Sequence, residues 1–273
     1  MQDIDIPDNP KRPVVLCLSG LDPSGGAGIQ ADIEALFSAG CHCAPVITAL
    51  TVQDSRNVIE SQACDPALIV RQARAVLEDL PVNAVKLGLA GSVGMLEVIH
   101  TLLRDYPQLP VIADPVLKAS GGHDFGSKGL IEAYRDLILP LATVITPNSE
   151  ELDQLANTSD SNDAAASELL DTGCRHVLLT GTHLNEEQVI NRLYTQHSPV
   201  KRYTWPRLPE VYHGSGCTLA ASLAGFLAHG VTVHEAVLQA QQYTWNALDN
   251  ADRPGLGQFM PNRAWWARNT PGQ

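Results

Sequence analysis

The sequence is defined first by what it lacks. No apolar run approaches the length of a bilayer span, and the N-terminal stretch MQDIDIPDNPKRP has no apolar core of the signal-peptide kind. Basic residues are few: 18 Lys and Arg stand against 30 Asp and Glu, giving a net charge of −12, and they form no basic run. We therefore expect neither a membrane nor a nucleic acid as a partner.

The six cysteines show no zinc or disulfide pattern. They are scattered, mostly in apolar surroundings, and Cys41 and Cys43 flank His42 too closely for a structural metal site without further ligands. A chain of this length without a signal peptide is expected to keep reduced thiols, which predicts a cytoplasmic location.

What the sequence does contain is a regular alternation of short apolar strands with amphipathic helices. With 273 residues and 44% hydrophobic content, the chain can bury one large core or at most two. No linker or repeat divides it, so we expect a flexible lead-in over 1–12 and one domain over 13–273. The alternation predicts βαβ units, which means a mostly parallel sheet with helices on both faces.

The expected elements are as follows. Strands are predicted at 13–18, 44–52, 84–88, 110–114, 142–148 and 176–181, and a hairpin of edge strands at 188–205. Helices are predicted at 26–39, 65–80 (with Asp65 as N-cap), 93–106, 127–138, 216–229 and 233–249, with two more helical stretches after 148. Polar, glycine-rich segments follow the strands, at the edge of the sheet where such folds bind ligands.

The stretch HGSGCTLAASLAG, residues 213–225, contains the most suggestive of these segments. Glycines precede an apolar helix, so free backbone N–H groups would meet the positive end of the helix dipole and form an anion site. In the plainer alternative the glycines only allow close packing, and Cys217 is a small buried hydrophobe.

The stretch SGLDPSGGAGIQAD, residues 19–32, resembles a nucleotide loop without being one. Gly26 stands where a Walker A loop needs lysine, and the glycine spacing does not fit a dinucleotide fingerprint. We interpret it as a tight loop in contact with a small ligand, with Asp32 directed toward the site. The alternative for Asp32 is a solvated carboxylate at a helix start.

Carboxylates after two of the strands suggest a magnesium site. Asp114 ends a buried strand, and Glu151 shares a helix face with Asn148, so the two acids could hold Mg²⁺ through water. An ordinary helix cap by Asn148 and Glu151 is the alternative. Together with the anion site, these acids indicate phosphoryl transfer.

The motifs are similar to those of the hydroxymethylpyrimidine/phosphomethylpyrimidine kinases of thiamine biosynthesis, in the ribokinase-like superfamily. The similar segments are GLDPSGGAGIQADIEAL, VITALTVQD, AVKLGLAGS, DPVL, LILPLATVITPNSEEL, GTHL, HGSGCTLAASLA and AWW, in this order from about residue 14 onward. The resemblance implies a three-layer αβα sandwich. Sugar kinases of the superfamily carry an aspartate base where this chain has Cys217.

The resemblance also implies roles for the substrate pocket. Gln53 would hydrogen-bond the aminopyrimidine, Gly20 and Asp32 would line the same pocket, and Leu89 and Val116 would sandwich the ring. Leu89 stands where methionine is common, which similar volumes should tolerate.

For the phosphate side, the resemblance implies an anion hole formed by Gly214, Ser215, Gly216 and Cys217. Cys217 would be the candidate base, since a helix N-terminus lowers a cysteine pKa, or would contribute its backbone N–H alone. Asp114 and Glu151 would serve Mg²⁺.

Asn148 would contact the nucleotide phosphates, where Thr180 replaces the lysine usual in the family. The loop DPVLKASGG is one residue short of the usual form, and whether Lys118 takes over a phosphate contact stays open. The replacement of the lysine by Thr180 puts catalytic efficiency in doubt, not fold.

The sequence thus predicts a cytoplasmic, Mg²⁺- and ATP-dependent kinase of 4-amino-5-hydroxymethyl-2-methylpyrimidine and its monophosphate. Its partner would be this small-molecule pyrimidine, and a homodimer is expected from the resemblance alone. A pyridoxal/pyridoxine kinase of the same superfamily is one alternative. A non-catalytic pyrimidine-binding homologue, suggested by the missing lysine, is the other.

Overall fold

The computed structural model describes residues 12–117, 125–157, 160–181 and 187–267. The lead-in expected over 1–12 falls almost entirely outside them, as does Lys118. All strands of the described residues form one nine-stranded sheet, in the order β3-β2-β1-β4-β5-β6-β7-β8-β9. The strands are β1 (Val14–Leu21), β2 (His42–Gln53), β3 (Val58–Ala63), β4 (Val82–Leu87), β5 (Val111–Ala113), β6 (Val144–Ile145), β7 (His176–Leu179), β8 (Gln188–Thr195) and β9 (Lys201–Pro206).

The centre of the sheet is parallel and its edges are antiparallel. Strands β2, β1, β4, β5, β6 and β7 pair in parallel, whereas β3 turns back on β2, and β8 and β9 continue antiparallel from β7. The carboxyl ends of the six parallel strands therefore meet at one edge of the sheet.

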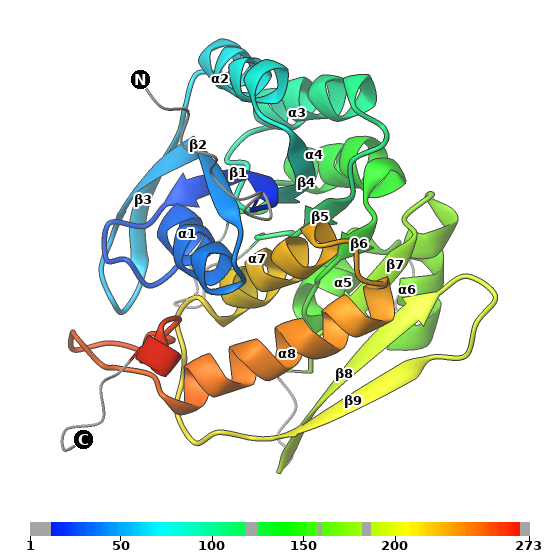
Figure 1. Cartoon of the computed structure of the whole chain (residues 1–273). Coiled ribbons are helices and arrows are strands. Elements are labelled where there is room, and N and C mark those ends of the chain that lie inside the picture. Colours follow the sequence, from blue (N-terminus) through cyan, green and yellow to red (C-terminus); the bar gives the residue numbers. More distant parts are fainter. Residues whose placement is uncertain (1–11, 118–124, 158–159, 182–186, 268–273) are drawn as a thin grey trace, which may run out of the picture.

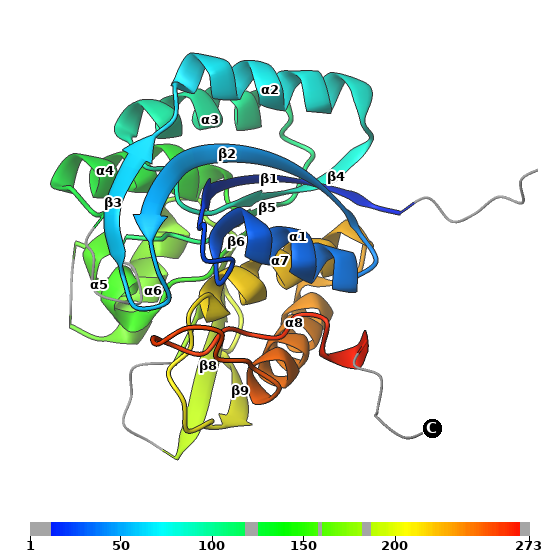
Figure 2. The ribbon, with the colours of Figure 1, turned by 90° about the vertical axis from the view of Figure 1, so that its left-hand side faces the viewer.

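Helices cover both faces (Figures 1 and 2). One face packs against α2 (Pro66–Asp79), α3 (Val93–Asp105), α4 (Lys128–Ala133), α5 (Ser149–Leu155) and α6 (Asn162–Asp171), and the other against α1 (Gly28–Ser38), α7 (Ser215–Ala228) and α8 (Val233–Asp249). Strand β1 shows why: Leu16 and Leu18 enter the first core, while Val15 and Cys17 enter the second. The predicted three-layer αβα sandwich is confirmed.

Most predicted elements are present, and the differences have local causes. Asp65 caps α2 as expected, accepting a hydrogen bond from the Ala67 N–H. Strand β3 was missed because it is an edge strand whose residues are half polar and half exposed. The helix expected over 127–138 ends at Ala133, continues as one π-helical turn (Tyr134–Ile138) and closes as a 3-10 turn (Leu139–Leu141) that contains Pro140.

Candidate active site

A cavity of about 810 Å³ opens at the carboxyl ends of the parallel strands, over the start of α7. On the side of β1, β2 and β4, the predicted residues Gly20, Gln53, Leu89 and Val116 line it. On the side of β6 and β7, Asn148, Glu151 and Thr180 line it. Asp114 and the segment Gly214–Cys217 lie between these two groups, since α7 packs against β1, β4 and β5.

Asp32 is the one predicted site residue that does not line this cavity. It lies behind the wall, fully buried, and forms an ion pair with Lys86 in which Lys86 Nζ is 2.8 Å from Asp32 Oδ1. Ser19 Oγ donates to Asp32 Oδ2 at 2.5 Å, and both Ser19 and Lys86 do reach the cavity. The prediction that Asp32 lines the pocket is therefore wrong, and so is the alternative of a solvated carboxylate.

Lys86 is a site residue that the sequence analysis missed. Burial lowers the pKa of Lys86, but attraction to Asp32, Cys217 and Asp114 outweighs burial and holds that pKa above its usual value. The cavity wall thus contains a permanent cation. A lysine inside the apolar strand AVKLG was the available signal, because a buried ammonium needs a carboxylate partner.

The start of α7 presents unpaired backbone donors to the cavity. Gly214 is the N-cap, and the first intrahelical bond runs from the Thr218 N–H to the Gly214 carbonyl at 3.0 Å. Among the described residues, the N–H groups of Ser215, Gly216 and Cys217 form no backbone hydrogen bond outside the helix itself. A Cβ on Gly216 would lie 3.9 Å from Asp114 Oδ1, so the start of α7 lies close to the Asp114 carboxyl group.

The backbone conformation and the surroundings of residue 214 require glycine at this position. Its φ is +85°, and a Cβ there would lie 1.9 Å from the Gly26 carbonyl oxygen. The loop 22–28 and the segment 213–218 thus touch backbone to backbone, at a distance that only glycine permits.

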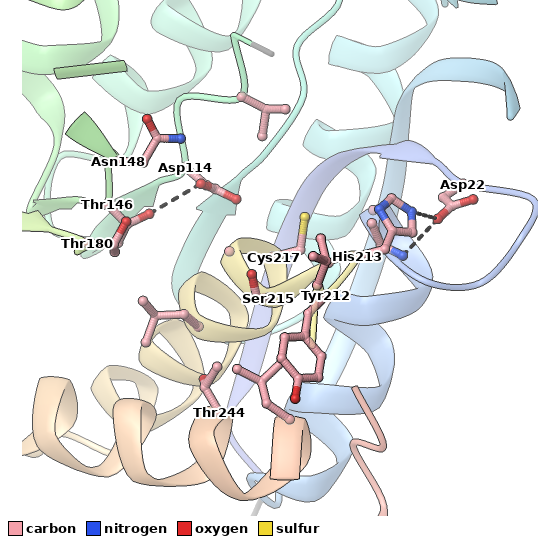
Figure 3. A pocket seen from close by; sticks show the side chains of 18 of the residues that line it. Asp22, Asp114, Thr146, Asn148, Thr180, Tyr212, His213, Ser215, Cys217 and Thr244 are labelled. Carbon is pink, nitrogen blue, oxygen red and sulfur yellow. Dashed lines mark hydrogen bonds and ion pairs between the residues drawn. The ribbon is translucent and has the colours of Figure 1, made fainter. Parts of the chain in front are cut away.

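The expectation that the helix N-terminus lowers the Cys217 pKa is wrong. Burial raises the pKa of Cys217 to about 11; Lys86 opposes the rise, but Asp114 and Asp32 add to it. Cys217 in turn lowers the pKa of the Asp114 carboxyl group, but burial outweighs that effect. Figure 3 draws Cys217 between Asp114 and Thr146 on one side and His213 and Asp22 on the other.

Asn148 and Glu151 form a complete capping box. Asn148 Oδ1 accepts from the Glu151 N–H, and Glu151 Oε2 accepts from the Asn148 N–H, each at 2.9 Å. The plainer alternative for this pair therefore describes its geometry correctly. Burial raises the pKa of Glu151 to about 8, with Asp114 adding to the rise, which an exposed cap would not show.

Asp114 and Glu151 fit a magnesium ion that keeps most of its water. Both are buried, and burial also raises the pKa of Asp114, with Lys86 opposing the rise. Two neighbouring buried carboxyl groups with raised pKa values favour a cation between them. The described residues hold no cluster of three or more His, Cys, Asp or Glu side chains that could bind a metal ion, so among them only these two carboxylates are candidates for this site. Few protein oxygens and several waters are the usual environment of Mg²⁺.

Asp22 and His213, also missed, join the two glycine loops inside the cavity. Asp22 accepts from the N–H groups of Ser24 and Ala27, both at 2.8 Å, and His213 Nε2 lies 2.7 Å from Asp22 Oδ2 (Figure 3). Burial would raise the pKa of Asp22, but hydrogen bonds from His213, Gln53 and Ser24 hold it well below its usual value. The Gln53 amide, at the end of β2, therefore lies beside an ionised carboxylate.

The opposite end of the cavity is built from a second polar network. Asn191 accepts from the Gly181 N–H and donates to Gln241, which also accepts from the Trp205 indole N–H. Thr180 pairs with Asn148 in a β-bridge and donates to the Pro147 carbonyl. None of Asn191, Gln241 and Trp205 carries a motif, so the sequence offered no signal for them.

None of the helices in the described ranges combines the length and the apolar character that crossing a membrane requires.

Solved structures of similar shape place the fold among ribokinase-like kinases. A pyridoxal kinase of Bacillus subtilis, solved as an ADP complex, superposes with a TM-score of 0.85 at 27% identity, over 95% of this chain and 100% of that one. A phosphomethylpyrimidine kinase of Clostridium difficile 630 has a TM-score of 0.74 at 30% identity, over 87% and 100%.

Within that class, the chain belongs to the phosphomethylpyrimidine kinase family, whose model matches residues 22–262. The hydroxymethylpyrimidine/phosphomethylpyrimidine kinase of Escherichia coli is 33% identical over 94% of this chain and 100% of that protein. The kinase of the same name from Streptomyces coelicolor is 36% identical over 93% and 95%. The chain spans about half the length of a thiamine biosynthesis bifunctional protein of Geobacter sulfurreducens, at 36% identity. The chain is thus a phosphotransferase.

Proposed function

We propose that this protein transfers the γ-phosphoryl group of ATP to 4-amino-5-hydroxymethyl-2-methylpyrimidine and then to its monophosphate. The observation that carries the proposal is that one cavity holds the Gly214–Cys217 donors between an apolar wall with Leu89 and Val116 and a polar wall with Asn148 and Thr180. Such an arrangement lets an acceptor alcohol and a phosphate donor meet over the same backbone N–H groups.

The wall formed by Gln53, Leu89 and Val116 would hold the pyrimidine. Leu89 and Val116 supply apolar surface for the faces of a flat ring, and Gln53, which lies beside Asp22, supplies an amide for its polar edge. Gly20 leaves room beside Leu89, because a Cβ at Gly20 would come within 3.0 Å of Leu89 Cδ2.

The start of α7 would stabilise the phosphoryl group in transfer. The N–H groups of Ser215, Gly216 and Cys217 are fixed before the reaction, so they can meet charge that develops on the phosphoryl oxygens. Lys86, buried in the cavity wall, adds a permanent positive charge. Asp114 and Glu151 would hold Mg²⁺ through water, and this ion would neutralise the charge on the phosphate oxygens.

Cys217 would act chiefly through its backbone. A metaphosphate-like transition state needs little help from a base, and the raised pKa keeps the thiol protonated at neutral pH. Asn148 and Thr180 would contact the nucleotide from the other wall, with the Thr180 hydroxyl in place of a lysine ammonium.

A pyridoxal kinase activity is the second candidate. The observation that favours it is the superposition on the Bacillus subtilis pyridoxal kinase, closer in TM-score than that on the Clostridium difficile kinase. The matching family model and the curated relatives favour the pyrimidine.

Steady-state assays with each alcohol and saturating Mg²⁺ and ATP would test the proposal. We expect kcat/KM for the hydroxymethylpyrimidine to exceed that for pyridoxal by at least about 10-fold. The reverse ranking would establish the second candidate. Binding of the pyrimidine without turnover of either alcohol would identify a non-catalytic homologue.

We also propose a cytoplasmic homodimer that pairs through the outer face of the β2–β3 ribbon. Leu50 and Val52 project from the same face of β2 and are 47% and 54% exposed, while Ile59 on β3 is 71% exposed. Exposed apolar side chains on a β-ribbon at the edge of the sheet favour association between copies of the chain. The cytoplasmic location is supported separately by the six free thiols, which fit a reducing compartment. Light scattering of the parent and of Leu50→Asp would test the dimer: a monomeric parent would contradict it.

A further inference from the structure

The chain that follows α8 returns to the active site without entering the cavity. Phe259 pairs with the segment before α7: its N–H donates to the Val211 carbonyl, and its carbonyl accepts from the His213 N–H. Four residues later, Arg263 is only 2% exposed and does not line the cavity. The sequence analysis gave this arginine no role.

The Arg263 guanidinium joins three parts of the protein. Its Nε donates to Thr218 Oγ1 at 2.9 Å, its Nη2 donates to the Gly26 carbonyl, and its Nη1 lies 3.0 Å from Glu34 Oε2. Thr218 Oγ1 in turn donates to the Gly214 carbonyl at 2.7 Å. One side chain thus connects the loop 22–28 to the N-cap of α7.

The contacts of Arg263 and Thr218 lie at the point where the two glycine loops, 22–28 and 213–218, approach each other most closely. Gly26 and Gly214 approach each other closely, and their contact is carbonyl against backbone rather than a hydrogen bond. The carbonyl of Gly26 is satisfied by Arg263, and that of Gly214 by Thr218. The guanidinium therefore supports the relative position of the loops from behind, in addition to the His213–Asp22 contact inside the cavity, and with it the direction of the N–H groups that follow Gly214.

The charge of Arg263 leads to the same conclusion. A buried cation beside the positive end of a helix is unfavourable unless an anion is near. Among the described residues its one carboxylate partner is Glu34, which is 40% exposed and so compensates the charge only weakly. A phosphate in the cradle would compensate both the cation and the helix end.

We propose that Arg263 is a positioning residue for the phosphate cradle, meaning the backbone N–H groups of Ser215, Gly216 and Cys217. It holds the loop 22–28 and the start of α7 in register from behind, and touches neither substrate nor reacting atoms. This role rests on the proposed function of the cradle.

Four variants of the full chain test this role. Arg263→Met removes all three contacts of the guanidinium and keeps an apolar side chain of similar length. Arg263→Lys keeps the positive charge, but its single ammonium group cannot contact all three partners. Thr218→Val removes the hydroxyl between Arg263 and Gly214 and leaves the arginine in place. The matched control is Glu34→Gln, which weakens the surface contact of the same guanidinium and touches neither loop.

Because Arg263 acts through other groups, we expect Arg263→Met to lower kcat about 10–100-fold, less than the ~10²–10³-fold loss for a donor that itself contacts the transition state. KM for the pyrimidine should stay within about two-fold, since the guanidinium bonds to Thr218, Glu34 and Gly26 and to none of Gln53, Leu89 and Val116. Thr218→Val should lower kcat in the same way, Arg263→Lys should recover part of it, and Glu34→Gln should leave it at the parental value. A parental kcat in both Arg263→Met and Thr218→Val would overturn the inference, as would an equal loss in Glu34→Gln.

A second measurement separates this inference from the proposed function. Calorimetric titration of inorganic phosphate into the ADP-bound protein reports on the cradle without any alcohol. If the parent phosphorylates neither alcohol, the proposed function fails, and the phosphate titration still decides the role of Arg263. We expect phosphate to bind at least about 10-fold more weakly to Arg263→Met than to Glu34→Gln; equal binding would refute the positioning role.

Discussion

Replacing Gly216 by alanine should yield a protein that is at least as stable as its parent and nearly inactive. Gly216 is the second residue of α7, and its φ is not in the left-handed region. The nearest atoms to an added Cβ are the Asp114 carboxylate oxygens, at 3.9 and 4.0 Å, which is ordinary van der Waals contact. The protein itself therefore has room for the methyl group.

The stability change follows from backbone entropy. Alanine in place of a helical glycine favours the helix by up to about 1 kcal/mol, and less in the first turn, where fewer hydrogen bonds depend on the residue. The new methyl group would instead occupy the space between the cradle and Asp114, where the phosphoryl group has to fit. Loss of one such donor typically lowers kcat by about 10²–10³-fold, so we expect a loss of that order or larger.

Gly94 provides the matched control. It is the second residue of α3, an added Cβ would meet only Pro66 Cγ at 3.8 Å, and it lies outside the cavity. Urea unfolding and steady-state turnover would be measured for both alanine variants. Both should match or exceed the parent in unfolding free energy, and only Gly216→Ala should lose kcat. Parental turnover in Gly216→Ala would show that phosphate does not pass over this residue, and would refute the cradle.

Three further substitutions test the rest of the site. Cys217→Ser keeps the backbone donors, so turnover should stay within a few-fold of the parent at each pH; a loss of ~10²–10⁴-fold would instead show that the thiol is a base. Glu151→Gln keeps an oxygen that accepts from the Asn148 N–H but loses the negative charge. The Mg²⁺ concentration that gives the half-maximal rate should therefore rise about 10-fold or more, with little change in melting temperature. An unchanged Mg²⁺ dependence would show that Glu151 is not part of the metal site. Lys86→Met leaves Asp32 buried without its partner, so the unfolding free energy should fall by about 3–5 kcal/mol. Adding Asp32→Leu to this variant should restore part of the lost free energy. A loss below about 1 kcal/mol in Lys86→Met would show that the pair is not buried in solution.

Local pattern was enough to predict the layers of the fold and the edge that carries the site. Helices α7 and α8 begin and end within one residue of the predicted bounds, because apolar periodicity and turn residues are local signals. The predicted residues Gln53, Asp114 and Thr180 reach one cavity because each ends or directly follows a parallel strand, and parallel strands end at a common edge.

The local sequence pattern could not predict the long-range interactions that shape this site. Lys86 meets Asp32 across 54 positions, His213 meets Asp22 across 191, and Arg263 meets Gly26 across 237. Such pairs are set by which strand lies beside which, and neither residue of a pair identifies the other in the sequence. Edge strand β3 was missed for a related reason, since its pairing with β2 and not its own composition makes it a strand.

Cys217 shows the same division within a single residue. Its position at a helix start follows from the sequence, and the dipole of that helix favours a thiolate. Its burial and the nearby charges of Asp114 and Asp32 exist only in the folded chain, and together they raise its pKa instead. The sequence alone determined where the sulfur lies along the chain. The tertiary structure decided its charge, because desolvation depends on every element packed around it.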